Sequence, residues 1–579
     1  MFSLYDPLDE LVRVELSEYD DLTASLLARR SITNKREAER FLKPSYDEHL
    51  HDPLLMTDMK KAAERLAKAI SSREKVAVWS DYDCDGGPGG VLMHDFLKKA
   101  GATFENYIPH RHLEGYGMNV LGVEKLAEHG VGLIVTVDSG ITDIEPVARA
   151  NELGMNVIIT DHHLPFVASS EVGPTLPDAF AVVDPKAHAD ETYPFKELCG
   201  AGLAWKLVCA TLAIAPELRQ RVGAGWEKWL LDMAGLATIA DMVPLVGENR
   251  VLASYGLLVL RKSPRLGLQK LCRVMRVDQR RFTEDDVGFM LAPRVNAASR
   301  MGDAYDVLRL FTTTDEAEAE RLAKGLEVAN RQRKAAAGAI TRTVHTRLSE
   351  RGAVRDVIAL GDPEWRPALL GLVANGIADE YNRPVFLWGR EGNMSLKGSV
   401  RSGGGVHAIE LMAATQGAFA EFGGHAASGG FTLTEDGVFM LEDCLVDAFA
   451  RLEVADTPDK LAGYADAEVS PEAVTLSLLA SLEKLAPFGM GNPKPLFLMR
   501  EVSIEKVTRF GKGSEHLKLS ITRAGEPLQA ITFFAKGELA RRADALAAGG
   551  RANLLAHLER DTFTRGQPVR LRLVDLSLV

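Results

Sequence analysis

The stretch KVAVWSDYDCDG, residues 75–86, carries the pattern that decides the fold. Its apolar half, KVAVWS, leads directly into three aspartates, Asp81, Asp83 and Asp85. Helix-like segments such as VLMHDFLKKAG (91–101) separate it from later apolar runs of the same kind. These runs are LIVTVDSG (133–140), NVIITDHH (156–163) and AFAVVDP (179–185). Such an alternation predicts βαβ units around a parallel sheet.

Polar residues at the ends of these runs are the first candidates for a functional site, because parallel sheets bind ligands outside the carboxyl ends of their strands. Alternate residues of an extended segment point the same way, so Asp81, Asp83 and Asp85 are expected to converge. Two further runs are followed by Asp138 and by Asp161-His162-His163, and LATIADMVPL supplies Asp241. Convergent carboxylates repel one another unless a cation neutralises them, which indicates a metal site.

The types of these residues also indicate which metal is expected. Oxygen ligands with one or two imidazoles and no thiolate favour Mn²⁺ or Mg²⁺ over zinc, and Mn²⁺ suits the mixed set. Two ions about 3.5 to 4 Å apart could activate a water and stabilise the leaving oxygen of a phosphodiester. The alternative is that each Asp caps a helix or turn and each His is an ordinary polar residue. Their recurrence at successive strand ends favours the metal site.

The rest of the 579-residue chain divides by pattern into further units. Strong helix formers dominate from about residue 200 to 350 and predict a long connecting helix at the end of that region. A second α/β pattern begins at VRDVIALGD, and short alternating strands after about residue 455 predict a small β-barrel. The expected boundaries are 1–50 for an N-terminal segment, 51–310 for the catalytic domain, 311–352 for the connecting helix, 353–454 for the second α/β domain and 455–579 for the barrel.

Composition limits the class of protein. No run of 18 apolar residues occurs, and the N-terminus is acidic where a signal peptide is basic, so we expect a cytoplasmic protein that makes no contact with membranes. The five cysteines are scattered and are expected to be reduced thiols. A net charge of −12 does not exclude nucleic acid, because local charge density decides phosphate binding. Residues 261–281 contain eight basic residues and one acidic residue, although such runs are more often solvated helix faces.

Four motifs, DYDCDG, VDSG, TDHH and ATIADMVPL, occur here in the order typical of the DHH phosphoesterases, and the chain resembles that superfamily. The resemblance implies metal ligands at Asp83, Asp85, Asp138, His162 and Asp241. It implies that Asp81 supports or joins them in catalysis, and that His163 contacts the scissile phosphate. His163 would act as a general acid or stabilise charge, which its near-neutral reference pKa permits.

Further segments resemble the RecJ family within that superfamily. They are IPHRHLEGYGMN, LAPRVNAASRMGDA, NRQRK, KGSVRS, FGGHAASGG and LAPFGMGNPKPLF. The resemblance implies an α/β protein with a parallel-sheet DHH domain, a long connecting helix, an α/β DHH-associated domain and a C-terminal β-barrel of the oligonucleotide-binding (OB) type. It covers nearly the whole chain.

The same resemblance assigns substrate-binding residues. Arg111, Ser399 and Arg401 would hold the 5′-terminal phosphate, a task that suits guanidinium groups. Gly424 and His425, in GGHAASGG, would approach the substrate closely, although a simple tight turn is the alternative there. A segment with Arg294, Asn296 and Arg300 would line the nucleic-acid path, with a structural salt bridge as the alternative. Apart from the resemblance, Arg509, Phe510, Lys512 and Lys518 of the barrel could supply charge and stacking for a single strand, with a place in the core as the alternative for Phe510.

The family resemblance implies a metal-dependent 5′-to-3′ exonuclease that releases 5′-mononucleotides from single-stranded DNA in recombination and repair. We expect it to be a monomer with two Mn²⁺ or Mg²⁺ ions, working beside a helicase and a single-strand-binding protein. One alternative is a phosphodiesterase for short oligoribonucleotides or cyclic dinucleotides, which would have little use for the barrel. The other is a non-catalytic DNA-binding scaffold, which would not need the complete ligand set.

Two segments depart from the family pattern. After DYDCDG the chain reads Gly87-Pro88-Gly89-Gly90 where a small residue, Thr and Ser are usual, and Arg366-Pro367-Ala368 replaces the usual His-Pro-Gly. Glycines add conformational entropy to the unfolded chain, so replacing Gly89 with Thr and Gly90 with Ser is expected to raise the melting temperature.

Overall fold

A parallel five-stranded sheet forms the centre of the first domain in the computed structural model, which describes all residues except 1, 168–173, 393, 416, 453–462, 512, 536, 547–549 and 562–568. The strand order is β3-β2-β4-β5-β8, and every neighbouring pair is parallel. These strands are β3 (Thr103–Tyr107), β2 (Lys75–Ser80), β4 (Leu133–Val137), β5 (Asn156–Thr160) and β8 (Ala181–Val183). The predicted parallel sheet is confirmed.

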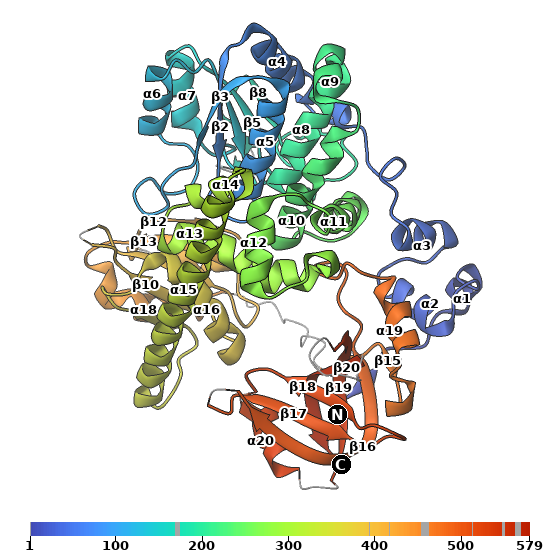
Figure 1. The fold of residues 1–579 in the computed structure, drawn as a ribbon. Helices are drawn as coiled ribbons and strands as arrows, with labels where there is room; N and C mark the ends of the chain where they lie inside the picture. The colour runs from blue at the N-terminus through green and yellow to red at the C-terminus, as the bar shows by residue number, and fades with distance from the viewer. Residues whose placement is uncertain are drawn as a thin grey trace.

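Helices cover both faces of this sheet (Figure 1). Val76 and Val78 pack with α4 (Met59–Ser72), α5 (Gly86–Ala100) and α8 (Gly200–Ile214), while Ala77 and Trp79 pack with α6 (Val120–Glu128) and α7 (Ile144–Glu152). Alternate residues of a strand therefore enter two different cores. This arrangement explains why each strand is a nearly continuous apolar run rather than an alternating one.

A layer of helices leads from the first domain to the second. It contains α9 (Pro216–Val222), α10 (Leu231–Ala240), α11 (Gly247–Leu260), α12 (Leu266–Met275), α13 (Ala292–Met301) and α14 (Tyr305–Thr312). The connecting helix is α15 (Glu316–Arg351), whose first backbone N–H groups are capped by the Asp315 carboxylate. At about 1.5 Å per residue its 36 residues span roughly 54 Å. The expected long helix is confirmed.

The second domain is a five-stranded sheet of order β12-β13-β11-β10-β9. Only β9 and β10 are parallel, and the remaining pairs are antiparallel. The strands are β9 (Ile358–Gly361), β10 (Val385–Gly389), β11 (Lys397–Arg401), β12 (Phe419–Gly424) and β13 (Ser428–Leu433). Packed against them are α16 (Pro367–Tyr381), α17 (Ala408–Ala414) and α18 (Gly437–Phe449).

The last domain is a closed barrel, because β16 pairs with both β17 and β19. Its strands are β16 (Phe497–Phe510), β17 (His516–Ile521), β18 (Leu528–Thr532), β19 (Arg551–Arg560) and β20 (Val569–Leu578). The short strand β15 (Ala467–Glu468) extends the sheet beside β16. Helices α19 (Leu476–Glu483) and α20 (Gly537–Ala545) accompany the barrel, which confirms the predicted C-terminal fold.

The N-terminal segment packs with this barrel rather than forming a unit of its own. Its helices are α1 (Glu10–Glu15), α2 (Asp21–Ala28) and α3 (Lys35–Leu42). Leu26, Leu27 and Phe41 lie in one apolar core with Leu479 and Phe497. In addition, β1 (Ser3–Leu4) pairs in parallel with β14 (Tyr464–Ala465). The N-terminal helices and the barrel therefore share one core. The expected domain boundaries remain a proposal.

No single described helix combines the length and apolarity needed to cross a membrane. Helices α8 and α9 meet that criterion only when taken together, and they are bent by 112° at their junction.

Candidate metal centre and substrate cleft

The aspartates after β2, β4 and β5 lie at one edge of the parallel sheet because the sheet hydrogen bonds continue one residue past each strand. The backbone N–H of Asp81 donates to the carbonyl of Val137 (3.2 Å), and that of Asp138 donates to the carbonyl of Thr160 (3.0 Å). Asp161 repeats the pattern, with its N–H 3.2 Å from the carbonyl of Val183. The expected position of these carboxylates at the carboxyl ends of the strands therefore follows from the backbone alone.

The expected reason for the convergence of Asp81, Asp83 and Asp85 is wrong. Strand β2 ends at Ser80, and the following residues form a turn rather than an extended segment. The Asp83 carboxylate closes this turn by accepting the backbone N–H groups of Asp85 (2.7 Å) and Gly86 (3.2 Å). Such aspartate turns compete well with extended backbone in a short polar segment. The carboxylates thus meet through the turn and not through strand alternation.

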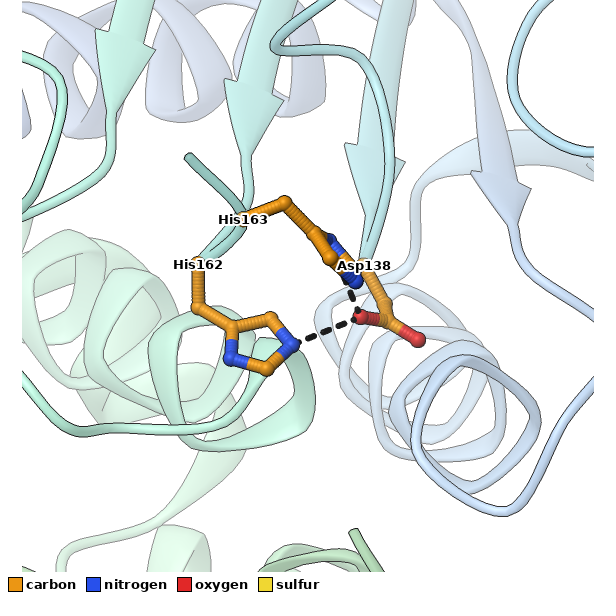
Figure 2. A group of neighbouring side chains, drawn as sticks. All are labelled: Asp138, His162 and His163. Atoms are coloured by element: carbon orange, nitrogen blue, oxygen red, sulfur yellow. Dashed lines mark ion pairs between the residues drawn. The ribbon is translucent and has the colours of Figure 1, made fainter. Parts of the chain in front are cut away.

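These side chains form three overlapping groups whose ligand atoms lie within 4.8 Å of one another. The groups are Asp81-Asp83-Asp138, Asp85-His162-Asp241 and Asp138-His162-His163. Nε2 of His162 lies 3.2 Å from Oδ1 of Asp138 and 3.7 Å from a carboxylate oxygen of both Asp85 and Asp241. Figure 2 shows His162 and His163 both pointing toward Asp138. Asp138 therefore lies at the junction of two potential ion positions.

The chemistry of this donor set fits divalent cations. Oδ1 of Asp81, Oδ1 of Asp138 and Nε2 of His162 are buried and have no hydrogen-bond partner among the described residues. Burial and the neighbouring Asp85 raise the pKa of Asp138 well above its usual range, and burial with Asp85 and Asp83 raises the pKa of Asp241 to about 9. Buried polar atoms are normally paired, so an orphaned cluster of anionic oxygens and one imidazole nitrogen is expected to bind metal.

Further contacts orient the potential ligands. The first backbone N–H groups of α8, at Gly200 and Ala201, donate to the Asp85 carboxylate at 2.6 and 2.8 Å. This is the usual binding of an anion by a helix N-terminus, and it turns both Asp85 oxygens toward the helix. Burial is the larger influence on Asp85 and, with Asp83, raises its pKa to about 6 against these two bonds.

His163 is held by Asp161 and Tyr116, to which the family resemblance assigned no role. Its Nδ1 lies 2.7 Å from Oδ1 of Asp161 and 3.1 Å from the hydroxyl of Tyr116. Burial opposes a charge on His163, but the hydrogen bond and the charge of Asp161 outweigh it and raise the pKa to about 9. Tyr116 also donates to the carbonyl of Asp138 (2.9 Å). The position of Asp161 after an apolar run was the available signal, whereas nothing local marked Tyr116.

The glycine tract after Asp85 belongs to the first turns of α5 and is buried. A Cβ at Gly89 would lie 2.5 Å from Cγ1 of Val137 and 3.2 Å from Cα of Ala201. At Gly90 it would lie 2.6 Å from the Ser80 hydroxyl oxygen. These are sub-contact distances to strands β2 and β4 and to α8, so the helix approaches the sheet through these glycines. The expectation that larger residues here stabilise the fold is wrong.

We expect Gly89→Thr to destabilise the protein by about 1–3 kcal/mol, because overpacking a close-packed core forces its neighbours to move. Gly87→Ala is the matched control, since a Cβ there would meet only Cγ1 of Val307 at 3.6 Å. Denaturant unfolding of the two variants beside the parent measures the difference. A Gly89→Thr midpoint equal to or above that of Gly87→Ala would contradict this packing argument.

A cavity of about 520 Å³ lies between the first domain and the second. Tyr82, Arg111 and Tyr116 line it from the first domain, while Lys397 and Phe422 belong to the strands β11 and β12 opposite. Nδ1 of His112 pairs with Oε2 of Glu391 across the domain boundary at 2.5 Å. The cavity is therefore a cleft between the two domains. The His112–Glu391 pair joins the two domains beside it.

Of the predicted 5′-phosphate residues, Arg111 lines this cleft, whereas Ser399 and Arg401 lie on β11 outside its lining. The Arg111 guanidinium lies 4.6 Å from the centre of the Tyr82 ring. Ser399 and Arg401 are two residues apart on β11 and so lie on the same face of the strand. Burial lowers the pKa of Arg401. Neither arginine has an ion pair with a carboxylate among the described residues, which leaves their charge for an anion. Within the described part of the chain no hydrogen bond joins Ser399 to either arginine, so their shared role remains a proposal.

Residues of the predicted nucleic-acid path have mixed environments. Arg294 forms an ion pair with Glu327 at 2.7 Å, which is the structural salt bridge that the sequence left as the alternative. Arg300 donates to the carbonyl of Ala368 in α16 (2.6 Å) and thus bridges the two domains, and Oδ1 of Asn296 is buried without a partner among the described residues. Within the basic run of residues 261–281, Arg265 forms ion pairs with Asp95 and Asp232 inside the first domain.

The glycine-rich segment forms the tip of the hairpin between β12 and β13. The N–H of His425 donates to the carbonyl of Ser428 (2.7 Å), which closes the turn between β12 and β13. Gly424 has φ of 143°, and a Cβ there would lie 2.4 Å from the Ser428 carbonyl oxygen, so only glycine fits. Burial and then the charge of His163 lower the pKa of His425. The tight turn that was the alternative is thus present, and the approach of this segment to the substrate remains a proposal.

On the barrel, aromatic rings gather where β16 and β18 end and β17 begins. Phe510 packs edge-on against His516 with ring centres 5.1 Å apart, and Phe533 lies 5.2 Å from His516. Phe534 is 61% exposed. Arg509 is paired with Asp544 (2.7 Å) and Lys518 lies on β17, whereas Lys512 lies outside the described residues.

Comparison with known proteins agrees with this architecture. Three family models match consecutive parts of the chain: the DHH family N-terminal domain at residues 75–238, the DHHA1 domain at 351–453 and the RecJ OB domain at 465–575. The single-stranded-DNA-specific exonuclease RecJ of Escherichia coli is 32% identical over 547 residues, which cover 89% of this chain and 90% of that protein. The chain belongs to the RecJ family.

Other RecJ proteins extend the likeness. RecJ of Bacillus subtilis is 35% identical over 564 residues, covering 96% of this chain and 68% of that protein. The crystal structure of RecJ from Thermus thermophilus in complex with Mn²⁺ superposes with a TM-score of 0.79 at 28% identity, over 99% of this chain and 79% of that one. The predicted family and domain composition are thus confirmed.

Proposed function

We propose that this RecJ family member is a metal-dependent exonuclease that degrades single-stranded DNA from the 5′ end and releases 5′-mononucleotides. The observation that carries the proposal is the position of Asp138 between two ligand groups at the edge of the cleft. Its relatives are single-stranded-DNA-specific exonucleases by name, and one was crystallised with Mn²⁺. Membership of the family also supports a cytoplasmic monomer that acts in recombination and repair beside a helicase and a single-strand-binding protein.

The proposed ligands are Asp83, Asp85, Asp138, His162 and Asp241. Burial, followed by the charge of His163, lowers the pKa of His162 to about 3, so its ring is neutral at neutral pH and has one nitrogen lone pair to offer a metal ion. Asp81 shares a ligand group with Asp83 and Asp138, and we propose it as a supporting or additional ligand. A bound pair of Mn²⁺ or Mg²⁺ ions would supply the charge that activates the attacking water and stabilises the leaving oxygen.

His163 is proposed to bind the scissile phosphate through Nε2. Its other nitrogen, Nδ1, is already engaged by Asp161 and Tyr116, so the ring presents Nε2 to the cleft. A raised pKa keeps the imidazole protonated at neutral pH, which suits a donor to a phosphate that gains negative charge. The Asp161 carboxylate then fixes both the orientation and the charge of this residue.

The polarity of digestion is proposed to depend on Arg111, Ser399 and Arg401. A 5′-terminal phosphate bound between Arg111 of the first domain and β11 of the second would place the first phosphodiester near the aspartates at the edge of the parallel sheet. Guanidinium groups without carboxylate partners are well suited to this anion. The continuing strand would pass Asn296, Arg300, Gly424 and His425 toward the aromatic rings of the barrel, where stacking accepts any base sequence.

The function is tested by digestion of one single-stranded oligonucleotide labelled at either end, with Mn²⁺, Mg²⁺ or a chelator. We expect the 5′ label to appear at once as a mononucleotide and the 3′ label to remain on steadily shortening products. The chelator is expected to abolish both. Release of the 3′ label first would reverse the proposed polarity, and binding of DNA without degradation would favour the scaffold alternative.

A further inference from the structure

The segment LAPFGMGNPK, residues 485–494, lies at the joint between the barrel and the catalytic domain. The backbone N–H of Leu245 donates to the carbonyl of Met490 (2.7 Å), and that of Phe488 donates to the carboxylate of Glu284 (3.1 Å). Lys494 forms an ion pair with Asp285. The segment therefore contacts the catalytic domain on both sides of its turn, just before β16 begins at Phe497.

Arg250, in the first turn of α11, is the centre of this joint. It is only 2% exposed, and its guanidinium stacks on the Phe41 ring with Cζ 3.6 Å from the ring centre. Its side-chain hydrogen bonds go to backbone carbonyls outside the catalytic domain: Phe41 (2.6 Å), Leu485 (3.0 Å), Ala486 (2.9 Å) and Pro487 (3.5 Å). One side chain of the catalytic domain thus holds both α3 and the segment that leads into the barrel.

Arg250 has no ion-pair partner among the described residues, which separates it from an ordinary buried salt bridge. Burial, with the nearby charge of Arg30, lowers its pKa to about 9. Burying a guanidinium is costly unless its donors are paired, and here the carbonyls pair them. A residue kept in so demanding an environment is expected to be used for precise placement of the groups that it binds.

Asn492 completes the joint from the barrel side. It is fully buried, and its amide donates to the carbonyls of Leu485 (2.8 Å) and Pro487 (2.7 Å), two of the carbonyls that Arg250 also binds. Its Oδ1 accepts a hydrogen bond from Nε of Arg30 in the N-terminal segment (2.6 Å). The turn is therefore held rigid from within while Arg250 fixes it from outside.

We propose that Arg250 is a positioning residue that fixes the barrel relative to the metal centre, and so sets the affinity for strands long enough to contact both. The inference rests on the proposed function. Two binding surfaces at a fixed separation act on one strand with a high effective concentration, which falls when the joint becomes loose. Chemistry at the cleft does not depend on the joint, because Arg250 contacts none of the proposed ligands.

The test compares Arg250→Met with the parent enzyme on a trinucleotide and on a strand of about 30 nucleotides, which exceeds the roughly 4–16 nucleotides that one OB fold covers. We expect KM for the long strand to rise about tenfold or more, a modest part of the gain available from linked sites. The kcat on both substrates and the KM of the trinucleotide should stay unchanged. Equal loss on both substrates, or no loss on either, would overturn the inference.

Arg265→Met is the matched control, because Arg265 is an arginine with a side chain only 12% exposed whose carboxylate partners, Asp95 and Asp232, lie within the catalytic domain. Arg265→Met should lower the melting temperature but should not change the ratio of KM for the long strand to KM for the trinucleotide. Small-angle scattering gives an independent readout: the radius of gyration should rise for Arg250→Met and not for Arg265→Met. An unchanged radius with an unchanged KM for the long strand counts against the proposal.

A charge exchange keeps the inference testable if Arg250→Met does not fold. Asp285 and Lys494 are partly exposed, so Asp285→Lys should fold but repel Lys494 across the same joint. It should raise KM for the long strand only, and the double variant Asp285→Lys with Lys494→Asp should restore it. If the parent enzyme degrades neither substrate, the proposed function fails. If it degrades both with equal KM, only the positioning role fails.

Discussion

Replacement of Asp138 with asparagine is expected to reduce hydrolysis of single-stranded DNA by about a thousandfold, a loss seen when one strongly stabilising group is removed from an active site. Asp138 belongs to two of the three ligand groups, and its Oδ1 lies 3.2 Å from Nε2 of His162. Its loss should therefore disturb both potential ion positions at once. Initial rates on a 5′-labelled strand at saturating Mn²⁺ measure the effect.

The same substitution should not damage the fold. Asp138 is buried beside Asp81, Asp83 and Asp85, and these carboxylates repel one another in the absence of metal. The metal-free Asp138→Asn variant should therefore have an equal or higher melting temperature, by about 1–4 °C per kcal/mol of repulsion removed. Added Mn²⁺ should stabilise the parent more than the variant, because a ligand stabilises the state that binds it.

Asp232→Asn provides the control for burial alone. Asp232 is a buried aspartate of the same domain that accepts the guanidinium of Arg265 and belongs to none of the three ligand groups. Breaking this pair should lower the melting temperature, since it leaves the largely buried Arg265 with Asp95 as its one remaining carboxylate partner among the described residues. Activity below the transition should be retained. Full activity of Asp138→Asn, or inactivity of Asp232→Asn while still folded, would remove Asp138 from its proposed role.

Replacement of Arg401 with alanine is expected to reduce the preference for 5′-phosphorylated over 5′-hydroxyl DNA by about 10- to 100-fold, the value of one or two hydrogen bonds to a charged group. Arg401 lies on β11 and has no ion-pair partner among the described residues. The ratio of kcat/KM for the two kinds of end isolates this contribution, because losses common to both substrates cancel.

Arg347→Ala is the control for this second substitution. Arg347 belongs to α15 and pairs with Asp362 of the second domain (2.6 Å), so its loss removes an arginine without touching the cleft. The end preference should remain, and Arg401→Lys should retain part of it as a single positive charge. An unchanged preference in Arg401→Ala would mean that other residues recognise the end.

Sequence alone was sufficient for the sheet and for the residues at its edge. Runs such as LIVTV are apolar on both faces, which only a strand covered on both sides requires, and Asp138 and His162 follow such runs closely. The chemical type of the site then follows, because carboxylates and imidazoles at one edge of a sheet suit few ligands other than divalent cations. Family motifs added residue roles that no periodicity could supply.

Tertiary structure decided which segments meet. Glycine at position 89 was expected to cost stability through the entropy of the unfolded chain, yet Gly89 is where α5 packs closely against Val137 and Ala201. Arg250 binds Phe41 and Leu485, each more than 200 residues away in the chain, and nothing near Arg250 names these partners. A local pattern indicates how much of a residue is buried, because burial depends on the face of its own helix or strand. The pattern does not indicate which distant residues will pack against it, because that contact depends on the shapes of both surfaces in the folded protein.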